Sequence, residues 1–251
     1  TNKEIEELEN KYLNKFYHFL KYAEDEMMLG FETKEKIKND WKDKYGSNIS
    51  DFAVGAERII YALFNGKGVG QPNSCPVGSD MFFEVNDAFI HIDLKTVQTR
   101  NIGDVTKNIF IGNNQNSYQA EIKKENGSSF NPPRIYEPAL PTFYNKGKIN
   151  EKICLTFFIT IVYEDVNLNI LNINLLCMPN GELVNHYGSK VLSPGKLEDK
   201  ARFSFKKIPT FELLDLPRSR VKVIYFDDSM DNQLKESLSF YKEIYHDQGD
   251  F

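Results

Sequence analysis

Apolar residues recur along the chain at two periods, and the period separates helical from extended segments. Residues 2–29 place apolar side chains such as Phe16 and Leu20 at helical spacing, with Glu and Lys between them. This spacing predicts one amphipathic helix, which Gly30 would end. A second, strongly charged helix is predicted over residues 33–45, which hold the only tryptophan. The chain therefore begins with a helical segment.

A third helix is predicted over residues 51–64, with Asn48 or Ser50 as its N-cap. Its apolar stripe includes Ala56, and Glu57 lies about 100° further round the helix. Glu57 would thus lie along the border of the core. The pattern leaves two interpretations open, an ordinary solvated glutamate and a functional carboxylate.

Period-two alternation and long apolar runs predict the strands of the second half. Residues 153–163 form the strongest predicted strand, and residues 169–178 return beside it. Further strands are predicted over residues 202–208 and 220–226, and a closing amphipathic helix over 232–245. Helices that lead and close around strands indicate one α/β domain with a mixed sheet.

The connecting segments carry weaker signals. Residues 117–124 are predicted as a short helix, whereas residues 127–141 and 181–200 are predicted as loops. Residues 109–118 are crowded with amide side chains. They fit a turn-rich loop, and they equally fit a segment that reads base edges, because Asn and Gln pair bidentately with adenine.

A β-hairpin is predicted in the first half of the chain. Residues 81–85 form its first strand, Asn86 and Asp87 its two-residue turn, and residues 89–94 its return strand. Alternation places Ile90, Ile92 and Leu94 on one face of the return strand, opposite Phe89, His91, Asp93 and Lys95.

Three charges meet at one end of this hairpin. Asp93 and Lys95 leave the strand on the same side, and Asp80 begins the neighbouring strand. A surface salt bridge would explain them at a gain of at most about 1 kcal/mol. A core strand has no structural need for three charges there, so we predict a candidate active site.

Composition and charge distribution narrow the classes of function. The 251 residues are 41% hydrophobic and 27% charged, as in ordinary globular proteins. The net charge is −5, but residues 95–152 carry nine bases against five acids, and residues 196–222 carry eight against four. Residues 227–251 carry seven acids and two bases. A basic middle can present a positive cleft to phosphates despite the acidic tail.

The cysteines and the hydropathy indicate a cytoplasmic protein. The three cysteines are an odd number without a CxxC pair, which argues against a disulfide framework or a zinc site. Cys154 and Cys177 lie in apolar runs and are expected in the core, and Cys75 has no nearby histidine to activate it. No apolar run approaches the ~20 residues of a membrane-spanning helix, and the acidic N-terminus is unlike a signal peptide.

The charged cluster suits metal-assisted phosphodiester hydrolysis. The carboxylates of Asp80 and Asp93 are hard oxygen ligands of the kind that Mg²⁺ prefers, and the Leu94 carbonyl can supply another. The Lys95 ammonium can orient or help to deprotonate the attacking water, and it can stabilise the charge of the transition state.

At these residues the sequence resembles the PD-(D/E)xK nucleases, and type II restriction endonucleases among them. Asp80 stands thirteen positions before Asp93-Leu94-Lys95, and Thr96 to Asn101 continue the motif with polar residues. The resemblance implies metal ligation by Asp80 and Asp93, water positioning by Lys95, and a match of Glu57 to the carboxylate that many relatives offer from the preceding helix. Ser79 stands where the motif has proline.

The resemblance also implies a fold and a function. The fold would be a restriction-endonuclease-like core over residues 49–251, a mixed central β-sheet flanked by helices, after a helical segment over residues 1–48. The function would be Mg²⁺-dependent cleavage of both strands at a specific DNA site, leaving 5′-phosphate and 3′-hydroxyl ends, by a homodimer in the cytoplasm of a prokaryotic cell.

The side chains expected to contact DNA come from the polar and basic segments that follow the motif. They are Thr96, Gln98, Arg100, Asn101, Lys107, Asn113, Asn114, Gln115 and Arg134, and the basic stretch over residues 196–222 would add phosphate contacts. Two alternatives remain at this point: a structure-selective repair or recombination nuclease with the same chemistry, and a non-catalytic DNA-binding protein that retains the fold.

Overall fold

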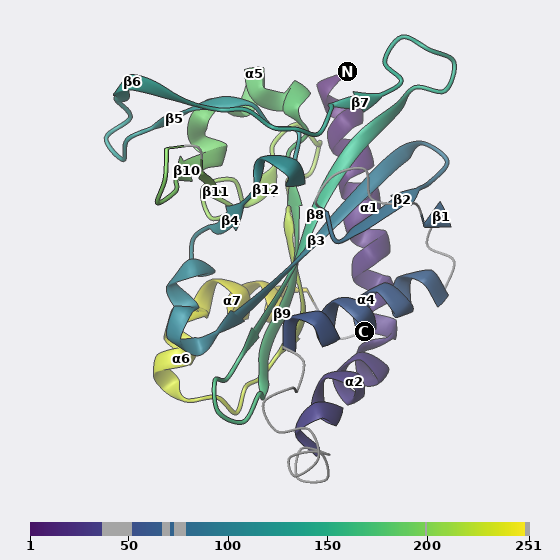
Figure 1. Cartoon of the computed structure of the whole chain (residues 1–251), viewed down its shortest axis with the longest axis vertical. Coiled ribbons are helices and arrows are strands. Elements are labelled where there is room, and N and C mark those ends of the chain that lie inside the picture. Colours follow the sequence, from purple (N-terminus) through teal and green to yellow (C-terminus); the bar gives the residue numbers. More distant parts are fainter. Residues whose placement is uncertain (37–51, 67–70, 73–78, 199, 249–251) are drawn as a thin grey trace.

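The computed structural model describes residues 1–36, 52–66, 71–72, 79–198 and 200–248 (Figure 1). The helices are α1 (Asn2–Tyr22), α2 (Glu24–Lys36), α4 (Phe52–Gly66), α5 (Val184–Tyr187), α6 (Asn232–Ser237) and α7 (Ser239–Asp247). Short 3-10 helices are η2 (Thr99–Asp104), η3 (Asn113–Gln115), η4 (Gly181–Leu183) and η5 (Gly188–Val191).

A mixed sheet forms the centre of the described part of the chain. Its strands are, in spatial order, β1 (Gln71–Pro72), β2 (Met81–Glu84), β3 (Ala88–Gln98), β8 (Lys152–Tyr163), β9 (Ile170–Met178) and β14 (Val221–Phe226), and β7 (Phe143–Tyr144) also pairs with β8. Strands β3 and β8 run parallel, whereas the other neighbours in this sheet are antiparallel. The predicted α/β class with a mixed sheet is confirmed.

Three smaller strand groups complete the fold. They are β10 (Leu192–Pro194) with β11 (Ala201–Phe203) and β4 (Ile109–Ile111), then β12 (Thr210–Phe211) with β13 (Arg218–Ser219), and β5 (Ala120–Lys123) with β6 (Ser129–Tyr136). In Figure 1, the β5–β6 hairpin extends away from the main sheet at the upper left.

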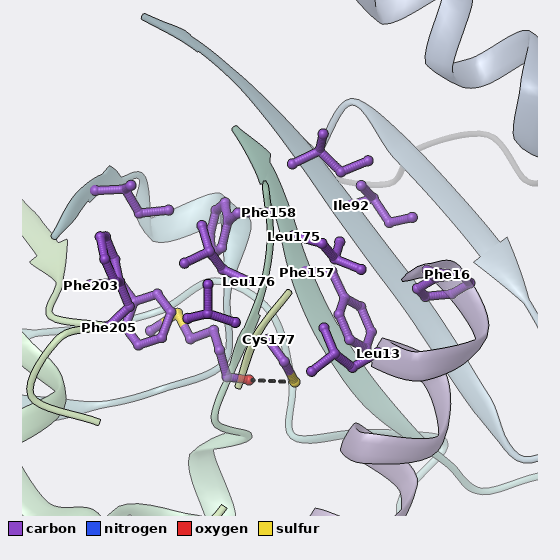
Figure 2. Close-up of a cluster of buried hydrophobic side chains, with 14 of the residues drawn as sticks. Leu13, Phe16, Ile92, Phe157, Phe158, Leu175, Leu176, Cys177, Phe203 and Phe205 are labelled. Atoms are coloured by element: carbon purple, nitrogen blue, oxygen red, sulfur yellow. Dashed lines mark hydrogen bonds between the residues drawn. The ribbon is translucent and has the colours of Figure 1, made fainter. Parts of the chain in front are cut away.

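The main sheet is covered on both faces, and successive residues of β8 show how. Phe157 points towards α1, where its ring meets Phe16 edge-on at a centroid distance of 5.1 Å. The next residue, Phe158, points the other way towards Phe203 of β11, at 6.5 Å (Figure 2). Because both faces are buried, the strand reads as a nearly continuous apolar run rather than as an alternation.

The second face is closed further by the C-terminal helix. Phe205 lies 6.3 Å from Phe203 and 5.8 Å from Tyr241 of α7. Cys154 and Cys177 are fully buried in the strands β8 and β9, as predicted. Cys75 lies outside the described residues.

The N-terminal helical segment differs from its prediction in one respect. The predicted helix over residues 2–29 is divided at Ala23 into α1 and α2, and Gly30 lies inside α2 instead of ending it. A Cβ atom on Gly30 would lie 3.1 Å from Ile59 Cδ1, so the glycine allows α2 to approach α4 closely. The predicted helix over 33–45 is described only as far as Lys36, and both N-cap candidates also lie outside the described residues.

The helix predicted over residues 117–124 was wrong, and the loop predicted over 127–141 was wrong where β6 forms. Ala120 to Lys123 form strand β5, which pairs with β6 in the segment predicted as a loop. Ala120 and Ile122 are buried, whereas the alternate residues Glu121 and Lys123 are partly exposed. Four residues are too few to separate the two periods, so the cross-strand partner decides the conformation.

Two further segments are shorter or more divided than predicted. The predicted strand over 202–208 ends at Phe203, because the backbone turns there: the amide of Lys207 donates to Ser204 O at 2.9 Å. The closing helix is divided at Leu238 into α6 and α7. Residues 181–194, predicted as loop, contain η4, α5, η5 and β10.

A buried ionic network ties α1 to the far edge of the sheet. Arg220, directly before β14, lies 2.8 Å from Glu9 Oε2 and 3.2 Å from Glu6 Oε1, and all three side chains are fully buried. Glu9 also accepts the amide hydrogen of Asn180 at 2.7 Å, and Tyr187 donates its hydroxyl to Glu6. One cation therefore joins the first helix, the last strand and the segment between them.

Replacing the cation of this network should destabilise the protein strongly. The Arg220→Met variant leaves two buried carboxylates without a cation to neutralise them, so we expect its free energy of unfolding to fall by about 3–5 kcal/mol. Urea denaturation measures the change. Lys3→Met, which removes a solvent-exposed ion pair with Asp215, should cost less than about 1 kcal/mol. Equal losses in the two variants would contradict the role given to the network.

Candidate active site

The register of the β2–β3 hairpin brings two carboxylates together. Met81 pairs with Ile92, so Asp80, one residue earlier, comes alongside Asp93. The Leu94 amide donates to Asp80 Oδ2 at 2.6 Å. Asp80 stays exposed, whereas Asp93 is only 2% exposed. The hairpin thus places one carboxylate at the surface and the other inside the sheet.

Ser79 fixes the start of this strand where the resemblance would have proline. Its hydroxyl shares a hydrogen bond of 2.9 Å with His91 Nδ1, and His91 Nε2 shares one of 2.8 Å with the Tyr144 hydroxyl. Burial lowers the pKa of His91 to about 4, so the ring stays neutral at physiological pH. A side-chain bridge across the hairpin holds the residue directly before Asp80.

Lys95 lies on the same face of β3 as Asp93. Its Nζ is 2.5 Å from Asp93 Oδ2, as an ion pair without hydrogen-bond geometry, and 5.6 Å from the centre of the Phe158 ring. Asp93 is level with Phe158 in the parallel β3–β8 pair. Both charged groups therefore point towards the face that carries β4 and β11.

Burial sets the electrostatics of the pair. Burial raises the pKa of Asp93 to about 6; the Lys95 ammonium opposes this, and Asp80 and Glu57 add to it. Loss of hydration also raises the pKa of Asp80, against the Leu94 hydrogen bond and the charge of Lys95. Carboxyl groups whose pKa is raised in this way are typical of functional sites.

Glu57 reaches the cluster through its charge rather than by contact. Its side chain is exposed on α4, next to the buried Ala56. Partial loss of hydration raises the pKa of Glu57, and the neighbouring Asp80 raises it further. The carboxylate therefore faces solvent at the border of the site, within electrostatic range of Asp80 and Asp93.

One amide side chain joins the site from outside the hairpin. Gln115, at the end of η3, donates from Nε2 to Asp93 Oδ1 at 2.5 Å and accepts at Oε1 from Lys95 Nζ at 3.0 Å. The sequence singled out this residue as a DNA contact and did not predict its link to the charged pair. The crowding of amide side chains was the only signal in the sequence, and it does not show which way each side chain points.

The remaining residues expected to contact DNA are dispersed. Thr96 and Gln98 are half-buried on β3, and Asn113 and Lys107 are exposed near β4, with Asn114 half-buried beside Asn113. From Asp93 to Gln98 the strand extends about 17 Å, which separates the end of β3 from the charged pair.

Two arginines on the predicted list are held by other parts of the chain. Arg100, beyond that end of β3 with the exposed Asn101, lies 3.8 Å from Asp165. Arg134 donates to the carbonyl oxygens of Leu197, Glu198 and Lys200. The structure does not bring either guanidinium to Asp93.

The donor set fits a hard divalent cation. Among the described residues, no three His, Cys, Asp or Glu side chains form a ready-made cage. Asp80 and Asp93 offer two carboxylates; the buried Asp93 Oδ2 accepts no hydrogen bond but lies 2.5 Å from Lys95 Nζ. Mg²⁺ is commonly held by one or two carboxylates while it keeps several waters, so these residues match its requirements.

Comparison with known families decides what kind of protein carries this site. Residues 1–167 match the family described as type II restriction enzyme MwoI, N-terminal domain, and residues 170–226 match its central domain. The chain belongs to the MwoI family of type II restriction enzymes. Members of the MwoI family are site-specific deoxyribonucleases, which favours the restriction enzyme among the predicted functions. The border between the two matches falls in the β8–β9 connection.

Solved structures confirm the predicted fold. The restriction endonuclease BglI bound to its DNA recognition sequence superposes with a TM-score of 0.68 at 15% identity, over 89% of this chain and 91% of that one. Tetrameric SfiI bound to cognate DNA gives 0.67 at 15% identity, over 92% and 87%. A search of curated proteins finds no match. No helix among the described residues of this MwoI-family chain is long and apolar enough to cross a membrane.

The raised pKa of Asp93 predicts that ionisation of this carboxyl group lowers the free energy of unfolding. A carboxyl group whose pKa is higher in the folded chain than its ordinary 3.8 binds its proton more tightly when folded. The contribution of Asp93 to the free energy of unfolding is therefore complete below about pH 4. It is lost as the pH rises from there towards 6.

The Asp93→Asn variant should consequently gain about 1–3 kcal/mol of unfolding free energy at pH 7.5 in metal-free buffer, because the amide carries no charge. Denaturant titrations at pH 7.5 and pH 4 measure the difference, which should shrink at the lower pH. A variant that is less stable than the wild type at pH 7.5 would contradict the prediction.

Proposed function

We propose that this restriction enzyme hydrolyses both strands of a specific duplex DNA site in a Mg²⁺-dependent reaction that leaves 5′-phosphate and 3′-hydroxyl ends. The observation that carries the proposal is the meeting of Asp80, Asp93 and Lys95 at one end of the β2–β3 hairpin. Asp80 and Asp93 would hold Mg²⁺, with the Leu94 carbonyl as a further ligand. When bound, the ion would polarise the phosphate and lower the pKa of a bound water.

Lys95 is placed to act directly on the substrate and the attacking water. Its ammonium lies between Asp93 and Gln115 and is 18% exposed, so it can reach a phosphate at the surface of the site. We infer that it orients the attacking water and stabilises the charge that develops on the phosphate oxygens. Attack by water at phosphorus, with departure of the 3′ oxygen, yields the proposed ends. Glu57 would contribute a further carboxylate at the border of the site.

DNA would lie over the face that carries β4 and η3. Lys107 before β4 and Lys206 after β11 come together, since the Lys206 amide donates to Lys107 O at 3.3 Å, and both side chains are exposed with Lys207. Asn113 and Asn114 lie in the same turn as Gln115. This surface supports phosphate contacts from the lysines and base contacts from the two asparagines. BglI and SfiI, which share the fold, are bound to DNA in their structures.

The proposal extends to the assembly and the compartment. Each chain carries one cluster of catalytic groups, whereas a duplex presents two strands, so we infer a homodimer whose two-fold axis coincides with that of the site. We also infer action in the cytoplasm of a prokaryotic cell, in keeping with two buried, unpaired cysteines.

Cleavage of a long DNA of known sequence tests the reaction. With Mg²⁺ the protein should give discrete fragments that DNA ligase rejoins, and EDTA should abolish cleavage. Asp93→Ala should eliminate detectable cleavage while binding of a cognate duplex changes little, because a side chain that is only 2% exposed offers DNA little direct contact. Asp228→Ala, an exposed aspartate that pairs with Lys242, serves as control and should cleave normally. Cleavage by Asp93→Ala at the wild-type rate would refute the assigned site.

Sedimentation velocity tests the assembly. The protein should sediment with about twice the 29.1 kDa mass of one chain, both free and, after subtraction of the DNA, on a cognate duplex. A single chain on the duplex would contradict the proposed dimer, and a mass of four chains would match the assembly reported for SfiI.

A further inference from the structure

The amide of Gln115 makes three hydrogen bonds within the protein. Its Nε2 donates to Asp93 Oδ1, and its Oε1 accepts from both Lys95 Nζ at 3.0 Å and the Gly112 amide at 2.7 Å. The orientation of the amide follows from these partners. The reverse orientation would turn the NH₂ group towards two donors and the oxygen towards a carboxylate, so each contact would become repulsive.

The turn that carries Gln115 is itself held rigidly. Gly112 O accepts from the Tyr136 hydroxyl at 2.7 Å and from Asn116 Nδ2 at 3.1 Å, and Asn116 Nδ2 also lies 2.6 Å from that hydroxyl. Asn116 is fully buried and Tyr136 is 2% exposed. A Cβ atom on Gly112 would lie 2.6 Å from Asn114 Oδ1, so a side chain there would displace the Asn114 amide. The Gln115 amide is therefore held by a buried network rather than by solvent.

We propose that Gln115 is a positioning residue that orders the catalytic pair: it holds Asp93 Oδ1, which fixes Oδ2 beside the Lys95 ammonium, and it gives that ammonium a second fixed acceptor. The proposal rests on the proposed function of Asp93 and Lys95. Without this amide, the Asp93 carboxylate can rotate and the Lys95 chain loses the acceptor that limits its rotamers. Groups that orient a metal ligand commonly contribute 10- to 100-fold to metal affinity or activity.

This role differs from the one that the sequence suggested for Gln115. A bidentate base contact would require the amide oxygen to release Lys95 or Gly112, and the hydrogen bond from the charged Lys95 is strong. Asn113, two residues earlier, is exposed and has no such partners among the described contacts of its side chain. The turn thus divides its amides between the site and the surface.

Substitution by methionine separates the two roles, because methionine matches the length of glutamine without its hydrogen bonds. Gln115→Met should lower the single-turnover cleavage rate by about 10- to 100-fold and raise the Mg²⁺ concentration for half-maximal rate. Its dissociation constant for cognate DNA in Ca²⁺ should stay within about threefold of the wild type. Gln119→Met, an exposed glutamine four residues later, is the matched control and should behave as wild type.

A glutamate at the same position examines the donor half of the contact. Gln115→Glu keeps an acceptor for Lys95 and Gly112 but faces Asp93 with an oxygen, so it should cleave no faster than Gln115→Met. Full activity of either variant would overturn the proposal. A loss of DNA affinity as large as the loss of rate would also overturn it, in favour of a direct DNA contact.

A measurement on the metal-free wild type keeps the inference independent of cleavage. In ¹⁵N NMR spectra the side-chain amide protons of Gln115 should exchange with solvent more slowly than those of the exposed Gln119. Equal exchange would refute the positioning contact itself. Wild-type protein that shows slow exchange but fails to cleave with Mg²⁺ would refute the proposed function and leave the positioning contact in place.

Discussion

Strand β3 pairs in parallel with β8 from Ala88 to Gln98 while β2 pairs along its other edge, and the active site depends on this central place. A strand with neighbours on both edges and packing on both faces has a fixed register and direction. The β2 pairing covers Phe89 to Ile92 and fixes the register of β3. Asp93 and Lys95 lie just beyond it, where the β8 pairing and the hydrogen bond from the Leu94 amide to Asp80 hold the strand. The price is that Asp93 is almost fully buried.

The surroundings of Asp93 offset this burial only in part. Lys95 and Gln115 satisfy the carboxylate from one side, yet burial still raises the pKa of Asp93 to about 6. Because the charge of Asp93 is only partly neutralised, a further cation at the carboxylate would be favoured, and the site therefore suits a metal ion. Stability must then come from elsewhere in the fold. The apolar packing on the two faces of β8 and the ion pairs of Arg220 with α1 can supply this stability, because neither takes part in the proposed chemistry.

The two kinds of buried charge show different solutions to one problem. Around Arg220, two carboxylates and a tyrosine hydroxyl surround a cation in a closed network with no exposed member. Around Asp93, the network stays open at Asp80 and Glu57, both of which are exposed. A closed network suits a structural tie, whereas an open one can admit a cation and a phosphate. Exposure of the outer carboxylates is thus what distinguishes the candidate site from the structural pair.

Features that depend on neighbours along the chain follow from the sequence alone. The two-residue turn at Asn86 and Asp87 sets the hairpin register, so Asp80, Asp93 and Lys95 could be brought together from their spacing alone. Features that depend on partners distant along the chain are set by the folded arrangement. The strand at residues 120–123 is set by pairing with β6, and Gln115 turns inward because Asp93 and Lys95 lie opposite it. A hydrogen bond across twenty residues leaves no periodic trace in a sequence, since its free energy depends on where the fold places both partners.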